Sequence, residues 1–102
     1  MIQNKGTLKS EIKPGTKGFR IEWNQLDPRY ILSSSNNGNA YLLSFDDSDE
    51  LVLKKTYEHG AAVYGVSWNN YNPAIFASGC EDGIIRIFDI NNEGTKCILA
   101  LK

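Results

Sequence analysis

Residues 64–90 read YGVSWNNYNPAIFASGCEDGIIRIFDI, and this stretch decides the fold. At its start, apolar residues alternate with small or polar ones, which is the period-two pattern of a β-strand. Asn72-Pro73 ends that strand, because proline cannot donate a backbone hydrogen bond. Two more apolar runs follow at 75–79 and 84–90, and the Asp82-Gly83 between them is typical of a tight hairpin. The stretch therefore predicts three consecutive antiparallel strands.

The same pattern occurs earlier in the chain, displaced by the 45 residues that separate Trp23 from Trp68. The two copies align without a gap. Further identical pairs are Gly15 and Gly60, Asn24 and Asn69, Pro28 and Pro73, Ser33 and Ser78, and Gly38 and Gly83. A repeat of this length predicts a stacked or radial architecture.

Each copy of the repeat predicts four short strands. The expected strands of the first copy are 19–24, 30–34, 41–45 and 51–53. In the second copy, 97–101 is the expected fourth strand and follows the three predicted within 64–90. In the first copy, Asn37-Gly38 is expected to supply the positive φ angles of a tight hairpin. No segment shows a convincing helical period. Four strands in each repeat is the pattern of a propeller blade, so we expect an all-β fold of two four-stranded antiparallel blades.

Composition limits the class of protein. The 102 residues are 41% hydrophobic and 23% charged, as in a folded globular protein. A formal net charge of −1 offers no bulk attraction, so we expect neither nucleic acid nor a membrane as a partner. No apolar run approaches the roughly 20 residues that span a bilayer, and the first residues lack a signal-peptide core. Cys80 and Cys97 are interpreted as reduced thiols, which predicts a cytoplasmic or nuclear protein that is not secreted.

The second copy resembles a repeat of the WD-repeat β-propeller family. Residues 76–89, FASGCEDGIIRIFD, resemble the hallmark stretch of that family, with Phe88-Asp89 in place of Trp-Asp. Glu58-His59 stands where the family has Gly-His. The first copy is degenerate, because Pro14-Gly15 replaces the histidine motif and Leu43-Ser44 replaces Trp-Asp.

The resemblance implies a buried hydrogen-bond network made by His59, Ser78 and Asp82. The Asp82 carboxylate is expected to accept bonds from the imidazole and the backbone, and the Ser78 hydroxyl to bridge to the ring. Phe88 has no indole N–H, so the fourth bond of the family network is missing, and a partly satisfied network is weaker than a complete one.

His59, Ser78 and Asp82 also suggest a hydrolase triad, but no Gly-x-Ser-x-Gly elbow accompanies them. His59 is the only histidine, and no thiols have zinc-site spacing. We therefore predict no catalytic residue, no metal and no cofactor.

The resemblance also indicates which side chains line the face where propellers bind their partners. These are Phe19 and Asn36 in the first copy and Tyr64 and Glu81 in the second. Aromatic residues are enriched at interface hot spots, although Phe19 and Tyr64 could instead pack between loops. The acidic loop 46–50 is interpreted as a solvated connection, with a contact for a basic partner or phosphorylation at Ser48 as alternatives.

The repeat divides the chain into three parts. Residues 1–12 are predicted to be an outer strand of a preceding blade or a terminal extension, 13–57 the degenerate blade, and 58–102 the well-matched blade. Closed propellers have at least four blades. We therefore expect the chain to be a piece of a longer protein, to be completed by another chain, or to self-associate.

The function expected from the resemblance is a non-catalytic scaffold that binds other proteins. One alternative is a substrate receptor of a cullin ubiquitin ligase, for which Arg86 matches the pattern but Asn91 stands in place of a second arginine. Another is a coat or trafficking subunit, and a hydrolase is the least favoured.

Overall fold

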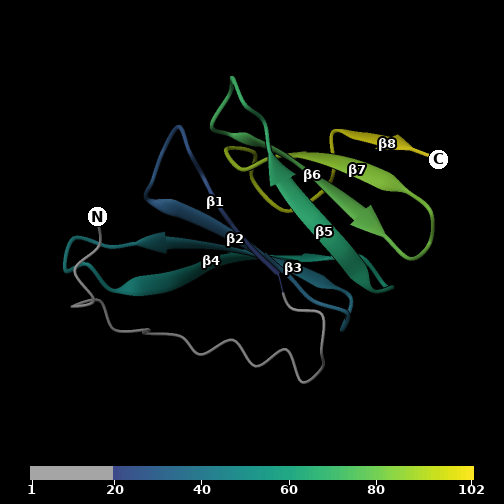
Figure 1. Cartoon of the computed structure of the whole chain (residues 1–102), viewed down its shortest axis with the longest axis horizontal. Coiled ribbons are helices and arrows are strands. Elements are labelled where there is room, and N and C mark those ends of the chain that lie inside the picture. The colour runs from purple at the N-terminus through teal and green to yellow at the C-terminus, as the bar shows by residue number, and fades with distance from the viewer. Residues whose placement is uncertain (1–19) are drawn as a thin grey trace.

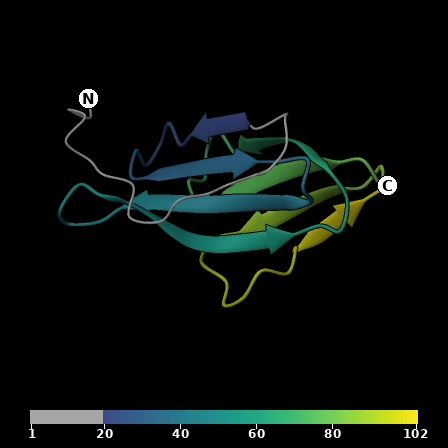
Figure 2. The same cartoon turned by 90° about the horizontal axis from the view of Figure 1, so that it is seen from below.

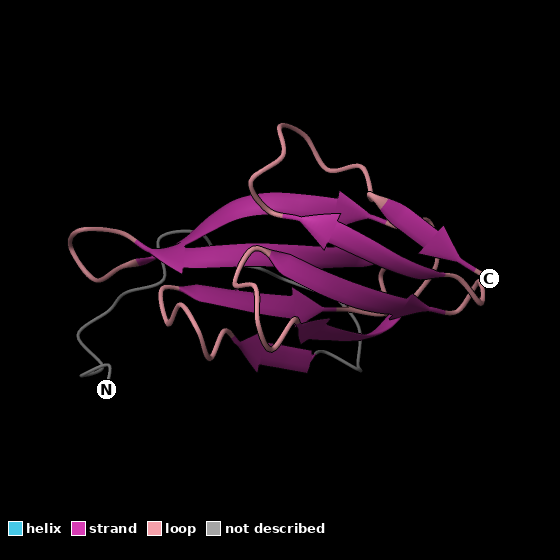
Figure 3. Ribbon diagram, turned by 90° about the horizontal axis from the view of Figure 1, so that it is seen from above, coloured by secondary structure: helices cyan, strands magenta, loops and turns pink. Residues whose placement is uncertain are grey.

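The computed structural model describes residues 20–102, which form two four-stranded antiparallel sheets and no helix (Figure 1). The first sheet has the order β1 (Arg20–Trp23), β2 (Tyr30–Ser34), β3 (Asn39–Phe45) and β4 (Leu51–Glu58). The second sheet has the order β5 (Val63–Trp68), β6 (Ile75–Cys80), β7 (Ile85–Asp89) and β8 (Leu99–Leu101). The predicted fold class of two four-stranded antiparallel blades is confirmed. The sheets lie on one another as two layers (Figures 2 and 3).

The tight hairpins differ from the prediction at the residue before glycine. Gly38 has a φ of 101° and Gly83 a φ of 81°, whereas Asp49 is the one non-glycine residue with a positive φ in the described part of the chain. A positive φ at Asn37 was therefore the wrong expectation. The Gly38 N–H donates to the Ser35 carbonyl (3.4 Å) and the Ser35 N–H donates to the Asn39 carbonyl (3.1 Å), so the left-handed conformation at Gly38 alone returns the chain to β3.

β4 runs five residues past the predicted end at Leu53, because it pairs with β3 as far as Asn39 opposite Glu58. The register shifts between Leu42 and Leu43, and Lys54 is the extra residue of the resulting bulge. A bulge reverses the alternation of side chains along its strand. Lys55 therefore lies opposite Leu42, on the other side of the sheet from the one an unbroken strand would give it.

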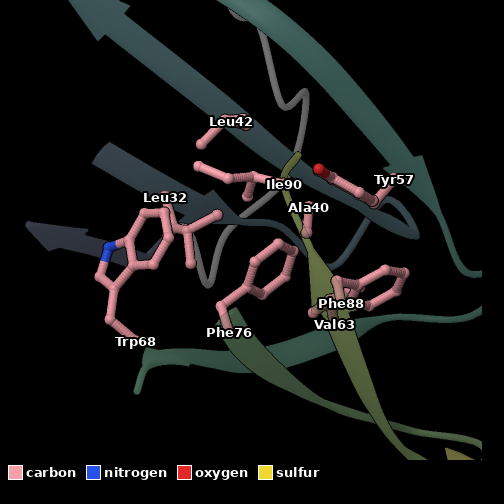
Figure 4. Close-up of a cluster of buried hydrophobic side chains, with 9 residues drawn as sticks. All are labelled: Leu32, Ala40, Leu42, Tyr57, Val63, Trp68, Phe76, Phe88 and Ile90. Carbon is pink, nitrogen blue, oxygen red and sulfur yellow. The ribbon is translucent and has the colours of Figure 1, made fainter. Parts of the chain in front are cut away.

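The main core lies between the two sheets (Figure 4). Its buried members are Leu32, Ala40, Leu42 and Tyr57 from the first sheet and Val63, Trp68, Phe76, Phe88 and Ile90 from the second sheet and its continuation. The rings of Phe76 and Phe88 stack with their centroids 4.9 Å apart, and Tyr57 meets both edge-on. Offset and edge-on aromatic packing is the favoured geometry, so these three rings fix how the sheets sit against each other.

The first sheet has a second apolar cluster on its other face. Ile31, Tyr41 and Leu43 are buried there, with Phe45, Leu51 and Leu53 packed against them. Successive residues of a strand point to opposite sides, so β2 and β3 contribute apolar side chains to both clusters. The first sheet is therefore apolar on both faces.

The second sheet has one face in the core and one face open to solvent. Two rows of residues in register cross the open face, namely Gly65, Gly79, Ile85 and Leu101, and Ser67, Ala77, Ile87 and Leu99. Ile85, Leu99 and Leu101 are each about half exposed. These eight residues are called the open face below.

Candidate functional site

Three loops meet at the end of the sheets where the hairpins turn. They are the β2–β3 turn (35–38), the β4–β5 connection (59–62) and the β6–β7 turn (81–84), and together they are called the hairpin end. Backbone hydrogen bonds join them, from His59 N–H to Gly38 O (2.7 Å), from Val63 N–H to Ser35 O (3.1 Å) and from Glu81 N–H to Ala62 O (2.8 Å). The hairpin end is therefore a backbone-linked platform to which both sheets contribute.

Tyr64 stands at this platform with 60% of its surface exposed. Val63 lies opposite Cys80 and Gly65 lies opposite Gly79, so Tyr64 is an extra residue in β5. Bulges of this kind re-aim a side chain, and this one turns a large ring outward from a rigid strand. An exposed aromatic ring held on such a strand is suited to contacting a protein.

Two other residues of the predicted partner face also lie at the hairpin end. Asn36 is exposed in the β2–β3 turn, and Glu81 is exposed in the β6–β7 turn. Phe19 lies outside the described residues. The structure brings Asn36, Tyr64 and Glu81 to one end of the molecule, and their role in binding stays a prediction.

His59 and Ser78 form the predicted contact between the β4–β5 connection and β6. The imidazole Nδ1 lies 2.9 Å from the Tyr57 carbonyl, which only accepts, so Nδ1 carries the proton and donates. Nε2 then accepts from the Ser78 hydroxyl at 2.8 Å. Burial lowers the pKa of His59, and nearby Arg86 adds to that effect while the Tyr57 carbonyl and Asp82 oppose it.

Asp82 does not join this pair in the structure, so that part of the predicted network is wrong. Its carboxylate accepts from the Arg86 guanidinium at 2.8 and 3.4 Å and from Ile84 N–H at 3.0 Å. These bonds, the one to Arg86 first, lower the pKa of Asp82 to about 2. The physical reason is competition, because the Tyr57 carbonyl takes the Nδ1 proton of His59 and Arg86 takes the carboxylate.

The polar contacts between the two sheets were not foreseen from the sequence. The Trp68 indole N–H donates to the Glu22 carbonyl (3.0 Å), and the Asn24 side-chain amide donates to the Pro73 carbonyl (2.8 Å). Asn24 Oδ1 also accepts two backbone N–H groups of its own loop, and Asn69 Oδ1 does the same 45 residues later. The identity of Asn24 and Asn69 in the repeat was the available signal for this loop motif.

Lys55 makes a third contact between the sheets. Its ammonium donates to the carbonyls of Ile90 (2.9 Å), Asn92 (2.5 Å) and Gly94 (3.2 Å) in the β7–β8 loop. The bulge at Lys54 places Lys55 in the same row as Leu42 and Leu32, which faces the second sheet. No sequence pattern revealed this, because the contact depends on a one-residue change of register.

Within residues 20–102, no group of three or more histidine, cysteine or acidic side chains is arranged to hold a metal ion. The same range contains no helix with the length and apolar character needed to cross a bilayer. Cys80 and Cys97 are both free thiols.

Two antiparallel four-stranded sheets related by a sequence repeat define a pair of propeller blades. Residues 51–89 match the family model described as WD domain, G-beta repeat. Over 73 residues the chain is 27% identical to dynein intermediate chain 2, ciliary, of Heliocidaris crassispina, a match that covers 72% of this chain and 10% of that relative. The family match shows a WD repeat at residues 51–89, and the chain spans about a tenth of the length of this relative.

Proposed function

We propose that the chain is a non-catalytic scaffold that binds protein partners at the hairpin end, with Tyr64 as the principal contact and Asn36 and Glu81 beside it. The observation that carries the proposal is the bulge in β5, which holds the Tyr64 ring 60% exposed next to three loops joined by backbone bonds. A preorganised surface loses little conformational entropy when a partner binds. The WD-repeat match supports a scaffold, since repeats of this family commonly serve as interaction modules.

The test compares two exposed tyrosines at opposite ends of the sheets. Tyr64 lies at the hairpin end, whereas Tyr71 lies in the β5–β6 loop with 93% of its surface exposed. Proteins captured from an extract of the source cells by the tagged chain should be lost with Tyr64→Ala and retained with Tyr71→Ala. Equal capture by both variants would contradict a partner site at the hairpin end.

We further propose that the open face is covered by another repeat unit, from the same polypeptide or from a second chain. The first sheet supports this, because its equivalent face is covered by the second sheet through the Trp68 and Asn24 contacts. The repeat places Ser67 and Asn69 where Glu22 and Asn24 stand in that interface. A following unit would therefore meet the Ser67 carbonyl as an acceptor and the Asn69 side-chain amide as a donor.

The named relative suggests where partners should first be sought. It is described as an intermediate chain of a ciliary dynein, and the match supports assembly with other subunits as the role of this chain. We propose a multi-subunit motor complex as the first context to test. Co-purification of dynein subunits with the wild-type chain and not with Tyr64→Ala is the expected result, and co-purification unaffected by that variant would argue against it.

A further inference from the structure

The first sheet extends past the second at the end opposite to the hairpin end, where β3 turns into β4 (Figure 1). Tyr30, Ser44 and Val52 form a row in register across β2, β3 and β4 there, on the face toward the second sheet. The centroid of the Tyr30 ring lies 6.5 Å from that of Trp68 in the second sheet. Ser44 and Val52 are only partly buried, so the second sheet covers this row at β2 and leaves it open at β3 and β4.

A pocket of about 430 Å³ lies over the open part of this row. Besides Tyr30, Ser44 and Val52, its lining residues are Arg29, Phe45, Asp46 and Lys54. A volume of this size is sufficient to hold a ligand group. The open face is on the far side of the second sheet, so a unit that covered the open face would not close this pocket.

Two basic side chains line the pocket from either side of β3. Arg29 directly precedes β2 and Lys54 is the bulge residue of β4, and these two strands lie about 10 Å apart. Asp27 fixes Arg29 by accepting from Nε (3.0 Å) and Nη2 (2.8 Å), and the guanidinium carbon lies 5.5 Å from the centre of the Tyr30 ring. A guanidinium has five N–H donors, so Arg29 keeps donors that Asp27 does not use.

The Lys54 ammonium is the uncompensated charge of the pocket. Its side chain is exposed, and it has no hydrogen-bond or ion-pair partner among residues 20–102. Asp46 is the carboxylate in the lining, and its Oδ1 accepts the backbone N–H groups of Ser48 (2.8 Å) and Glu50 (3.0 Å) in its own loop. A group that enters the pocket therefore meets two cations and one carboxylate that is already engaged.

This combination of charges and apolar surface selects the chemistry of the ligand. Asp46 disfavours a dianion such as a phosphate group, since Coulomb repulsion grows with the charge of the ligand. A carboxylate carries one charge and accepts from both cations. Tyr30 and Val52 supply apolar contact beside it.

We propose that the pocket binds an extended segment of a protein partner that has an aliphatic residue two positions from an acidic one. Side chains two positions apart lie on the same side of an extended chain, so both enter the pocket. The carboxylate lies between Arg29 and Lys54, and the aliphatic side chain lies on Tyr30 and Val52. The pocket is thus a second contact surface, at the other end of the sheets from Tyr64.

The test follows the amide NMR signals of the labelled 102-residue chain while blocked peptides are added. The first peptide is acetyl-Leu-Ala-Glu-Ala-amide, and the others replace its glutamate by glutamine or phosphoserine, or its leucine by glycine. The glutamate peptide is expected to shift the signals of Ser44, Val52 and Lys54 saturably. It should bind roughly tenfold more tightly than the glutamine peptide, because hydrogen bonds to a charged group are the stronger ones. The peptide without leucine should bind more weakly than the one that has it.

Variants of the chain separate the pocket from a general attraction between charges. Lys54→Gln should weaken binding of the glutamate peptide by roughly tenfold. Lys96→Gln is the matched control, because it removes an equally exposed lysine from the β7–β8 loop and should leave the affinity unchanged. Ser44→Leu keeps both cations and fills the pocket, so it should abolish the shifts while the signals of the second sheet stay in place.

Three results overturn the proposal, namely equal affinity for the glutamate and glutamine peptides, an absence of saturable shifts, and binding that survives Ser44→Leu. Tighter binding of the phosphoserine peptide overturns the choice of a carboxylate. Tyr64→Ala should leave peptide binding unchanged, so the outcome is independent of the capture test at the hairpin end.

Discussion

The first and second sheets are built on the same register and differ in how their faces are covered. Each has two rows of four residues in register, but most of those of the first sheet lie against its neighbour, whereas those of the second face solvent. The first sheet buries apolar side chains on both faces, whereas Ile85, Leu99 and Leu101 remain about half exposed on the second. The difference shows that strand pairing forms each sheet by itself, while burial depends on what lies alongside.

The largest effect is expected from removing a ring between the sheets. Phe76 is fully buried and packs on Phe88 and Tyr57, so Phe76→Ala should lower the free energy of unfolding by about 3–5 kcal/mol. Ile85→Ala on the open face of the same sheet should cost about 1 kcal/mol or less, because half of that side chain is already in water. Urea denaturation of both variants provides the comparison.

Equal losses for Phe76→Ala and Ile85→Ala would show that the open face is covered in solution. The contrast between the sheets would then disappear, and the oligomeric state of the chain would have to be measured before any other test.

Local pattern was sufficient to predict the strands and their pairing. Alternation at Val66 and Trp68 and the glycine turns are short-range signals, so they depend little on tertiary context, whereas Tyr64 leaves the alternation at the bulge in β5. Strand length was less predictable. β4 continues to Glu58 because β3 offers a partner along its whole length, and a partner strand is not a local property.

The candidate site could be predicted only in part, for a similar reason. The contact of His59 with Ser78 follows from the family resemblance. The pairing of Asp82 depends on whether the His59 imidazole or the Arg86 guanidinium reaches its carboxylate, and in the structure Arg86 does. The Lys55 contact required knowledge of the bulge at Lys54. A one-residue shift of register changes every side chain beyond it, and no composition or motif records such a shift.

A smaller effect is expected from the contact that Lys55 makes across the two sheets. Lys55→Met keeps the apolar stem and removes the ammonium that three carbonyls of the β7–β8 loop accept, so it should cost about 2 kcal/mol. Lys54→Met is the matched control, because Lys54 is exposed in the adjacent position and should change stability by no more than about 0.5 kcal/mol. Urea midpoints give the stability, and hydrogen exchange of residues 91–96 should increase in Lys55→Met alone. Unaltered exchange in that loop would mean that the ammonium does not hold it.

The smallest effect concerns the His59 and Ser78 pair, and it appears as a dependence on pH. Because burial lowers the pKa of His59, the unfolded chain takes up a proton near pH 6.5 that the folded chain still resists. Stability from this group is complete above pH 6.5 and falls as the pH drops toward the lower, folded-state pKa. Ser78→Ala removes the hydroxyl donor of Nε2 and should cost about 1 kcal/mol at pH 8.

Urea midpoints measured from pH 8 to pH 5 should decline for the wild type and decline less for His59→Phe. Asp82→Asn separates the contribution of the His59 and Ser78 pair from that of the Asp82 and Arg86 ion pair. The pKa of the Asp82 carboxyl is about 2, so that carboxyl titrates below this pH window. Its profile between pH 8 and 5 should therefore parallel that of the wild type. A profile that flattens in Asp82→Asn as it does in His59→Phe would place Asp82 back in the network with His59 and contradict the arrangement in the structure. The two blades would then differ by a buried network of three residues instead of by a single histidine contact, for which the first copy of the repeat has Pro14 and no imidazole at the equivalent position.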